Sequence, residues 1–294
     1  MTIEVRSLTR RFGDLVAVDD VSFVVPPGGL TGFVGGNGAG KTTTMRMVMG
    51  VLAAHRGEVL WSGEPVTAAD RRRFGYMPEE RGLYPKQGIL DQLVYLARLR
   101  GMDARAARSA IGELLERFGL AGRAKDALES LSLGNQQRVQ IIASLVPAPQ
   151  ALVLDEPFSG LDPAAVESMA DLLREQAAGG VPVVFSSHQL DLVDRLCDRM
   201  VVMAGGRVVA HGSADELRAG SALRYRVVLS DDASWLREQR GVRVVSLSGA
   251  EALVEVEQAG AEQELLAAAL ARGSVHDFSR VVPRLSEIFR EVAA

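Results

Sequence analysis

A glycine-rich segment, Gly35-Gly36-Asn37-Gly38-Ala39-Gly40-Lys41-Thr42, combines the residue types that bind phosphate. Glycines let the backbone wrap around a phosphate with its N–H groups, and a helix that starts there adds positive potential. In a G-x-x-x-x-G-K-T pattern the lysine reaches the outer phosphates and the threonine hydroxyl binds Mg²⁺. The alternative is a glycine-rich turn with a chance lysine, but the chain has only three lysines, Lys41, Lys86 and Lys125. We therefore predict a phosphate-binding loop at this segment.

Two adjacent carboxylates, Asp155 and Glu156, follow the apolar run Ala151–Leu154. In open α/β sheets, ligands bind in the crevice outside the carboxyl ends of the strands. There Asp155 can hold Mg²⁺, and Glu156 can polarise a water against a terminal phosphate. The alternative is a solvated acidic strand end, which the phosphate-binding loop disfavours.

Three further features can act on a bound phosphate or base, although each also has a purely structural interpretation. The segment Leu131–Arg138 opens a helix with Ser132 and Gly134, which suits either a second anion site or a simple helix cap. His188 follows an apolar strand, where its ring could donate to a phosphate oxygen or serve only the local structure. Phe12 is either a core side chain or a ring that stacks on a nucleobase.

The elements that must position these residues alternate between strand and helix up to about residue 212. Apolar, β-branched runs bounded by turn residues predict strands at Ile3–Ser7, Val21–Val25, Leu30–Val34, Ala151–Leu154, Val181–Ser186 and Arg199–Met203. Asp162 followed by Pro163 predicts the start of a helix. Between about 86 and 131 the apolar residues recur only at helical spacing, which predicts an inserted helical subdomain. This is the pattern of an α/β domain with a helical insertion.

After Gly220 the order of elements changes. The pattern predicts strands at Leu223–Leu229, Val242–Leu247, Ala252–Glu257 and Val275–Val282, and helices at Ala233–Arg240, Ala261–Arg272 and Leu285–Val292. The order β-α-β-β-α-β is that of a small ferredoxin-like α+β domain. We expect two domains, at 1–215 and 222–294.

Composition excludes several classes of protein. The chain has 294 residues with 47% apolar residues, enough for a core, and a net charge of −4 gives no basic excess for nucleic acid. A single cysteine, Cys197, excludes an internal disulfide framework. No apolar run reaches the roughly 18 residues of a membrane span, and the first residues have no apolar signal core, so we expect a cytoplasmic protein.

The order of these motifs along the chain resembles the ATP-binding subunit of an ABC transporter, over about residues 1–215. GGNGAGKTT (35–43) resembles the Walker A loop, LSLGNQQ (131–137) the signature motif and LVLDEP (152–157) Walker B. Ser159-Gly160-Leu161-Asp162 resembles the D-loop, and His188 the switch histidine. The fold that this implies is a P-loop ATPase core with a mixed sheet.

The resemblance also implies the roles of individual residues. It implies ATP contacts from Phe12, Gly35, Asn37, Gly38, Ala39, Gly40, Lys41, Thr42, Thr43, Ser132, Gly134, Asn135 and Asp162. It implies Mg²⁺ ligands in Thr42, Glu79 and Asp155, and catalytic roles for Glu156 and His188.

Three positions depart from the family pattern. Gly36 stands where proline is usual, and Leu133 and Asn135 replace a glycine and a glutamine of the signature. Glu79 stands where a glutamine normally binds Mg²⁺; it points toward the metal site, or else toward solvent or Arg81. The segment GYMPEERGLYPK with the added C-terminal domain resembles the sodium- and drug-export branch, whose permeases are separate chains.

This resemblance implies ATP hydrolysis by a head-to-tail sandwich dimer that drives an integral membrane permease from the inner face of the cell membrane. Leu83, Tyr84 and Pro85 are the expected permease contacts, and no nucleic acid is involved. Two alternatives stay open: an ABC-type ATPase that acts without a permease, and a C-terminal domain that senses a regulatory ligand.

Overall fold

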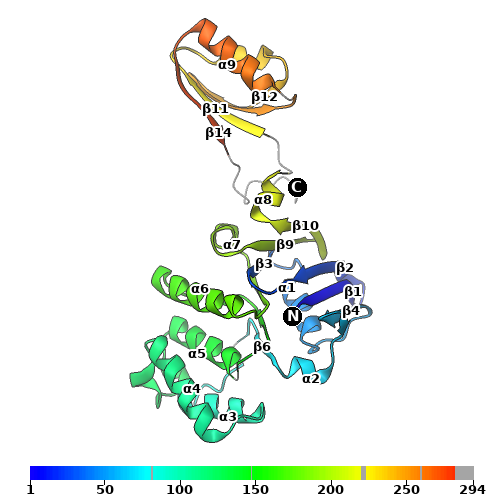
Figure 1. Cartoon of the computed structure of the whole chain (residues 1–294), viewed down its shortest axis with the longest axis vertical. Coiled ribbons are helices and arrows are strands. Elements are labelled where there is room, and N and C mark those ends of the chain that lie inside the picture. The colour runs from blue at the N-terminus through cyan, green and yellow to red at the C-terminus, as the bar shows by residue number, and fades with distance from the viewer. Residues whose placement is uncertain (81, 147, 220–222, 259, 282–294) are drawn as a thin grey trace. The chain divides into compact units, whose positions relative to one another are not determined.

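The chain folds into two compact units, Met1–Ser213 and Ala214–Ala294 (Figure 1). A computed structural model describes residues 1–80, 82–146, 148–219, 223–258 and 260–281. Each unit has its own cluster of buried apolar side chains. No helix in these ranges combines the length and the apolar character needed to span a membrane.

Two sheets build the first unit. One is antiparallel, with the order β2-β1-β4-β5, and consists of β1 (Ile3–Phe12), β2 (Leu15–Val25), β4 (Arg56–Trp61) and β5 (Glu64–Pro65). The other has the order β10-β9-β3-β8-β7-β6, and consists of β3 (Leu30–Val34), β6 (Phe74–Met77), β7 (Ala151–Leu154), β8 (Val183–Ser187), β9 (Arg199–Ala204) and β10 (Arg207–Ser213). The second sheet is mixed, because β10 runs antiparallel to β9 while the other neighbours are parallel.

Helices connect and cover these strands. They are α1 (Lys41–Val48), α2 (Ala68–Arg71), α3 (Ile89–Leu99), α4 (Ala104–Arg117), α5 (Leu133–Leu145), α6 (Pro163–Ala178) and α7 (Leu190–Leu196), with 3₁₀ turns at Ala121–Arg123 and Leu128–Ser130. Helices α3, α4 and α5 gather at one end of the unit, away from β1, β2 and β4 (Figure 1). The predicted insertion at 86–131 therefore holds α3, α4 and both 3₁₀ turns.

The direction of the central strands determines where the predicted site residues lie. Every residue of β3, β7 and β8 is buried, as expected for parallel strands covered on both faces. Because β6, β7, β8 and β3 run parallel, the segments that follow their carboxyl ends meet at one edge of the sheet. These four segments begin at Gly35, Pro78, Asp155 and His188.

The strand predictions were accurate in the centre of the mixed sheet and incomplete elsewhere. Predicted bounds match at β3 and β7, but β1 and β2 are longer than the predicted Ile3–Ser7 and Val21–Val25. Strands β4, β5, β6 and β10 were not predicted. Their sequences carry glycines, prolines or charged residues, which obscure the apolar pattern of a strand. In β6, a Cβ at Gly75 would lie 2.2 Å from the Ser144 carbonyl oxygen, so close packing requires this glycine.

The second unit is a four-stranded antiparallel sheet with helical segments inserted between strands. Its elements are α8 (Ala214–Ala219), β11 (Leu223–Leu229), the 3₁₀ segment η3 (Ser234–Glu238), β12 (Val242–Ser248), β13 (Glu251–Val256), α9 (Ala261–Arg272) and β14 (Val275–Val281). The strand order β12-β13-β11-β14 is ferredoxin-like. The predicted helix at Ala233–Arg240 is only the short η3, held by the buried Ala233 and Leu236. The predicted helix at Leu285–Val292 lies outside the described residues.

Because the buried clusters of the two units share no residues, we predict that a chain truncated near Ser221 folds independently. It should unfold in one cooperative transition close to a transition of the full chain, as followed by circular dichroism on heating. Aggregation or a gradual loss of signal would instead mean that the two cores depend on each other.

Candidate functional site

The glycine-rich loop connects β3 to α1 with its backbone curled around an open space. Lys41 is buried, and its Nζ donates to the carbonyl oxygens of Gly35 at 2.7 Å and Gly36 at 3.2 Å. Gly40 has φ +99°, and a Cβ there would lie 2.5 Å from the Ala17 carbonyl oxygen, so only glycine fits. A phosphate bound by the loop could accept hydrogen bonds from the Lys41 Nζ in place of these two carbonyl oxygens.

A cavity of about 560 Å³ opens in front of this loop. It is lined by the loop and by residues from four other parts of the unit. The lining residues are Phe12, Leu15, Val16, Ala17, Asn37, Gly38, Ala39, Gly40, Lys41, Thr42, Thr43, Glu79, Glu156, Gly205 and Gly206. Phe12 is 46% exposed, and the Arg10 guanidinium lies 4.8 Å from its ring centroid. An exposed ring with a cation over it is suited to stacking on a nucleobase.

Asp155 lies fully buried at the carboxyl end of β7. Its Oδ1 accepts a hydrogen bond from the Ser186 Oγ at 2.5 Å, whereas its Oδ2 is buried without a hydrogen-bond partner among the described residues. Burial raises the pKa of Asp155, and the Ser186 hydrogen bond opposes that rise. A buried carboxylate oxygen without a donor fits a bound cation.

Glu156 follows in a strained backbone conformation and points toward His188. Its φ is +52°, in the left-handed region that non-glycine residues rarely adopt. The His188 Nδ1 and the Glu156 Oε2 are 3.0 Å apart, and the Glu156 side chain is only 13% exposed. Burial raises the pKa of Glu156, and the hydrogen bond to His188 opposes that rise. A carboxylate with a raised pKa beside a phosphate cavity can accept a proton from water.

Glu79 approaches the phosphate-binding loop from the segment after β6. The Thr42 Oγ1 donates to the Glu79 Oε2 at 3.2 Å, so this glutamate faces the loop, while Arg81 lies outside the described residues. Among the described residues there is no cluster of three or more His, Cys, Asp or Glu able to hold a metal. Mg²⁺, however, needs only one or two carboxylates besides hydroxyl, water and substrate phosphate oxygens. The Thr42 hydroxyl and the carboxylates of Glu79 and Asp155 fit that requirement.

The residues of the predicted signature motif and D-loop lie outside this cavity. Ser132 caps the start of α5, where its Oγ accepts from the Asn135 N–H at 3.4 Å. Asp162 caps the start of α6, where its Oδ1 accepts from the Ala165 N–H at 2.8 Å. None of Ser132, Gly134, Asn135 and Asp162 lines the cavity at the glycine-rich loop. One copy of the chain therefore does not bring these four residues to its own phosphate site.

Comparison with known proteins assigns this geometry to a family. A model described as ABC transporter matches residues 18–159, and one described as ATP-binding protein DrrA1-3-like, C-terminal domain, matches residues 212–293. The ABC transporter ATP-binding protein YhaQ of Bacillus subtilis is 38% identical over 285 residues, covering 97% of this chain and 96% of that protein. The chain belongs to the ABC transporter ATP-binding family. Members of this family hydrolyse ATP.

Other relatives and a solved structure agree with this assignment. Nod factor export ATP-binding protein I of Burkholderia orbicola is 37% identical, covering 73% of this chain and 72% of that protein. Daunorubicin resistance ATP-binding protein DrrA3 of Streptomyces coeruleorubidus is 37% identical, covering 74% of this chain and 70% of that protein. A solved ATP-binding subunit of an ABC transporter matches with a TM-score of 0.69 and 32% identity, covering 74% of this chain and 92% of that one.

Two polar residues of this ABC subunit reach the site without having been predicted from the sequence. Ser186 is fully buried in β8, and Gln137 is buried on α5 with its side-chain amide on the backbone of Glu156. Gln137 is the last residue of the segment LSLGNQQ, and Ser186 follows the apolar run Val183–Phe185, but nothing local in the sequence indicates that either side chain contacts Glu156.

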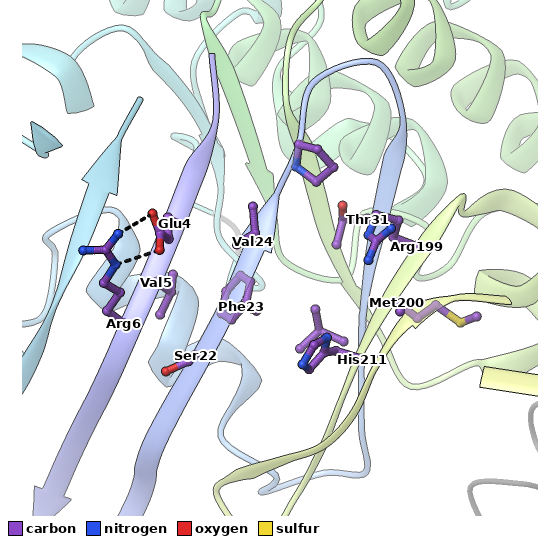
Figure 2. Close-up of a pocket in the computed structure, with 13 residues that line it drawn as sticks. Glu4, Val5, Arg6, Ser22, Phe23, Val24, Thr31, Arg199, Met200 and His211 are labelled. Atoms are coloured by element: carbon purple, nitrogen blue, oxygen red, sulfur yellow. Dashed lines mark hydrogen bonds and ion pairs between the residues drawn. The ribbon is translucent and has the colours of Figure 1, made fainter. Parts of the chain in front are cut away.

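Figure 2 shows the residues that line a second cavity, of about 440 Å³. Its lining includes Thr31 near the start of β3, whereas the glycine-rich loop follows the end of that strand. This second cavity is lined by Thr31, Arg199 and His211 together with residues of β1 and β2. None of the predicted site residues lines it, so it takes no part in the nucleotide site.

Proposed function

We propose that this ABC subunit hydrolyses Mg²⁺-bound ATP at the glycine-rich cavity and thereby powers a separate membrane permease of an export system. The main support is that Asp155, Glu156 and His188 lie together at the edge of the sheet next to the glycine-rich loop. The relatives named for Nod factor export and daunorubicin resistance support export, as does the DrrA-like C-terminal match. They favour transport over an ATPase that acts without a permease.

Different residues of the cavity have different roles in hydrolysis. The loop amides and Lys41 bind the phosphates, and Phe12 stacks on the base. Glu156 takes a proton from a water whose oxygen bonds to the γ-phosphorus, while the bond from that phosphorus to the bridging oxygen breaks and its electron pair leaves with ADP. The half-exposed His188 holds the Glu156 carboxylate at 3.0 Å and can donate to the γ-phosphate.

Mg²⁺, when bound, would neutralise charge that develops on the phosphate oxygens. Thr42, Glu79 and Asp155 are the residues proposed to hold it. Support comes from the Asp155 oxygen without a donor and from the Thr42–Glu79 hydrogen bond beside it.

A second copy of the chain is proposed to complete each site. Ser132, Gly134, Asn135 and Asp162 lie outside the cavity of their own chain, so in a head-to-tail pair they can meet the ATP of the partner. Such a pair would work at the inner face of the cell membrane. The proposed permease contact is Leu83, Tyr84 and Pro85, of which Tyr84 is 52% exposed.

Replacement of the proposed base tests the function. Glu156→Gln should lower ATP turnover at least a hundredfold, roughly the contribution of a general base, while ATP binding is kept because the loop is unchanged. Phosphate release and ATP-dependent dimers in size-exclusion chromatography measure the two properties. Lys41→Ala is the contrasting variant, expected to lose ATP affinity itself. Unchanged hydrolysis by Glu156→Gln would contradict the assignment.

Glu79 should make nucleotide binding depend unusually steeply on Mg²⁺. Without the metal, its charge repels the γ-phosphate; two unit charges 4 Å apart repel by about 4 kcal/mol at an effective dielectric of 20. With the metal, its carboxylate is a good ligand. Titrating ATP affinity against Mg²⁺ should therefore give a flatter curve for Glu79→Gln than for the wild type.

The neighbouring Glu80 supplies the matched control for that titration. Glu80 is exposed and pairs with Arg46 at 3.4 Å, so Glu80→Gln removes the same charge without touching Thr42. Its curve should follow the wild type. Superimposable curves for Glu79→Gln and the wild type would mean that Glu79 does not act on the metal.

A further inference from the structure

The backbone of Glu156 needs outside support to keep its conformation. Glu156 has φ +52°, in the left-handed region where the Cβ of a non-glycine residue crowds the backbone and strains it. The direction in which the carboxylate leaves the chain depends on this backbone conformation. Relaxation of the residue to a negative φ would change that direction. Groups that hold the two peptide bonds of Glu156 therefore aim its side chain.

The Ser186 hydroxyl holds the amide side of Glu156. Its Oγ accepts from the Glu156 N–H at 2.8 Å and donates its single proton to the Asp155 Oδ1 at 2.5 Å. Ser186 is fully buried, so water does not compete for either bond. One hydroxyl on β8 thus fixes both carboxylate-bearing residues at the end of β7.

The Gln137 side-chain amide holds the carbonyl side of Glu156. Its Nε2 donates to the carbonyl oxygens of Glu156 at 3.0 Å and Pro157 at 3.1 Å, which uses both of its protons. Gln137 is only 7% exposed and lies on α5, the helix that Ser132 caps. The turn after β7 is therefore held from a neighbouring strand and from a helix at once.

We propose that Ser186 and Gln137 are positioning residues for hydrolysis, which clamp the Glu156 peptide units and so aim its carboxylate at the attacking water. The inference rests on the proposed function, because it takes Glu156 as the base. Burying a polar side chain costs more free energy than burying an apolar side chain of similar size, unless hydrogen bonds compensate for the lost solvation. Here each side chain makes one of its hydrogen bonds to the backbone of Glu156, which has a positive φ and whose side chain lines the cavity.

The test separates kcat from nucleotide binding. Ser186→Ala and Gln137→Leu should each lower kcat by about 10- to 100-fold, the cost of misplacing a reacting group by about 1 Å. ATP affinity should stay within about twofold of the wild type, because neither side chain lines the cavity. Ser186→Thr keeps the hydroxyl and should recover most of the lost kcat.

Matched controls remove buried polar groups elsewhere in the same unit. Ser144 is fully buried and donates only to the Ile141 carbonyl, and Gln92 is buried with its amide on the backbone of Tyr84 and Gln87. Ser144→Ala and Gln92→Leu should keep kcat near the wild-type value. Thermal unfolding of all variants shows whether lost stability accounts for any lost rate.

Three results would overturn the proposal that Ser186 and Gln137, together called the clamp, position Glu156. They are wild-type kcat in Ser186→Ala and Gln137→Leu, equal losses of kcat and ATP affinity, or an equal loss of kcat in the Ser144→Ala control. Glu156→Gln is measured in the same series. If Glu156→Gln is inactive while the clamp variants match the wild type, only the clamp fails. If Glu156→Gln still turns over, the proposed base fails with it.

Discussion

The buried carboxylate of Asp155 is the constraint around which the nucleotide site is built. One of its oxygens has a hydroxyl donor and the other has no partner among the described residues, in a place that water does not reach. Taking an ion out of water costs on the order of several kcal/mol unless a partner compensates for the lost solvation. Ser186, Thr42 and Lys41 offset part of this cost, since all three lower the pKa of Asp155. The Mg²⁺ proposed to bind between Asp155, Thr42 and Glu79 would compensate for the remainder.

The parallel sheet is what makes this placement possible. Segments that follow β3, β6, β7 and β8 come from distant parts of the chain and meet at one edge because the four strands run in the same direction. Ser186 on β8 then joins the Asp155 carboxylate to the backbone N–H of Glu156, and Gln137 joins that turn to α5. The turn that carries Glu156 thus connects the cavity to the helix whose first turn carries the residues of the predicted signature motif.

Local chemistry made a large part of this arrangement predictable. The glycine spacing and the apolar runs located β3 and β7 with matching bounds, because a phosphate loop and a fully buried strand both leave strong local patterns. Strands β4 and β10 escaped prediction because their apolar runs are short: β4 begins with the exposed Arg56, Gly57 and Glu58, and β10 is mostly exposed or half-buried. In the second unit, α9 matched its predicted bounds, whereas the predicted helix before β12 shortened to a 3₁₀ segment. The role of Ser186 was not predictable, since it depends on a partner thirty-one residues away in the chain.

The most direct test of this account is the thermal unfolding of Asp155→Asn against the wild type, with ADP in the presence and absence of Mg²⁺. Asparagine keeps the oxygen that accepts from Ser186 and removes the buried charge. Without ligand, the variant should therefore unfold at a temperature at least as high as the wild type. Mg²⁺ should raise the unfolding temperature of the ADP-bound wild type by mass action and add nothing to the ADP-bound variant. An equal Mg²⁺-dependent increase in both proteins would contradict the assignment of Asp155 as the residue that receives the cation.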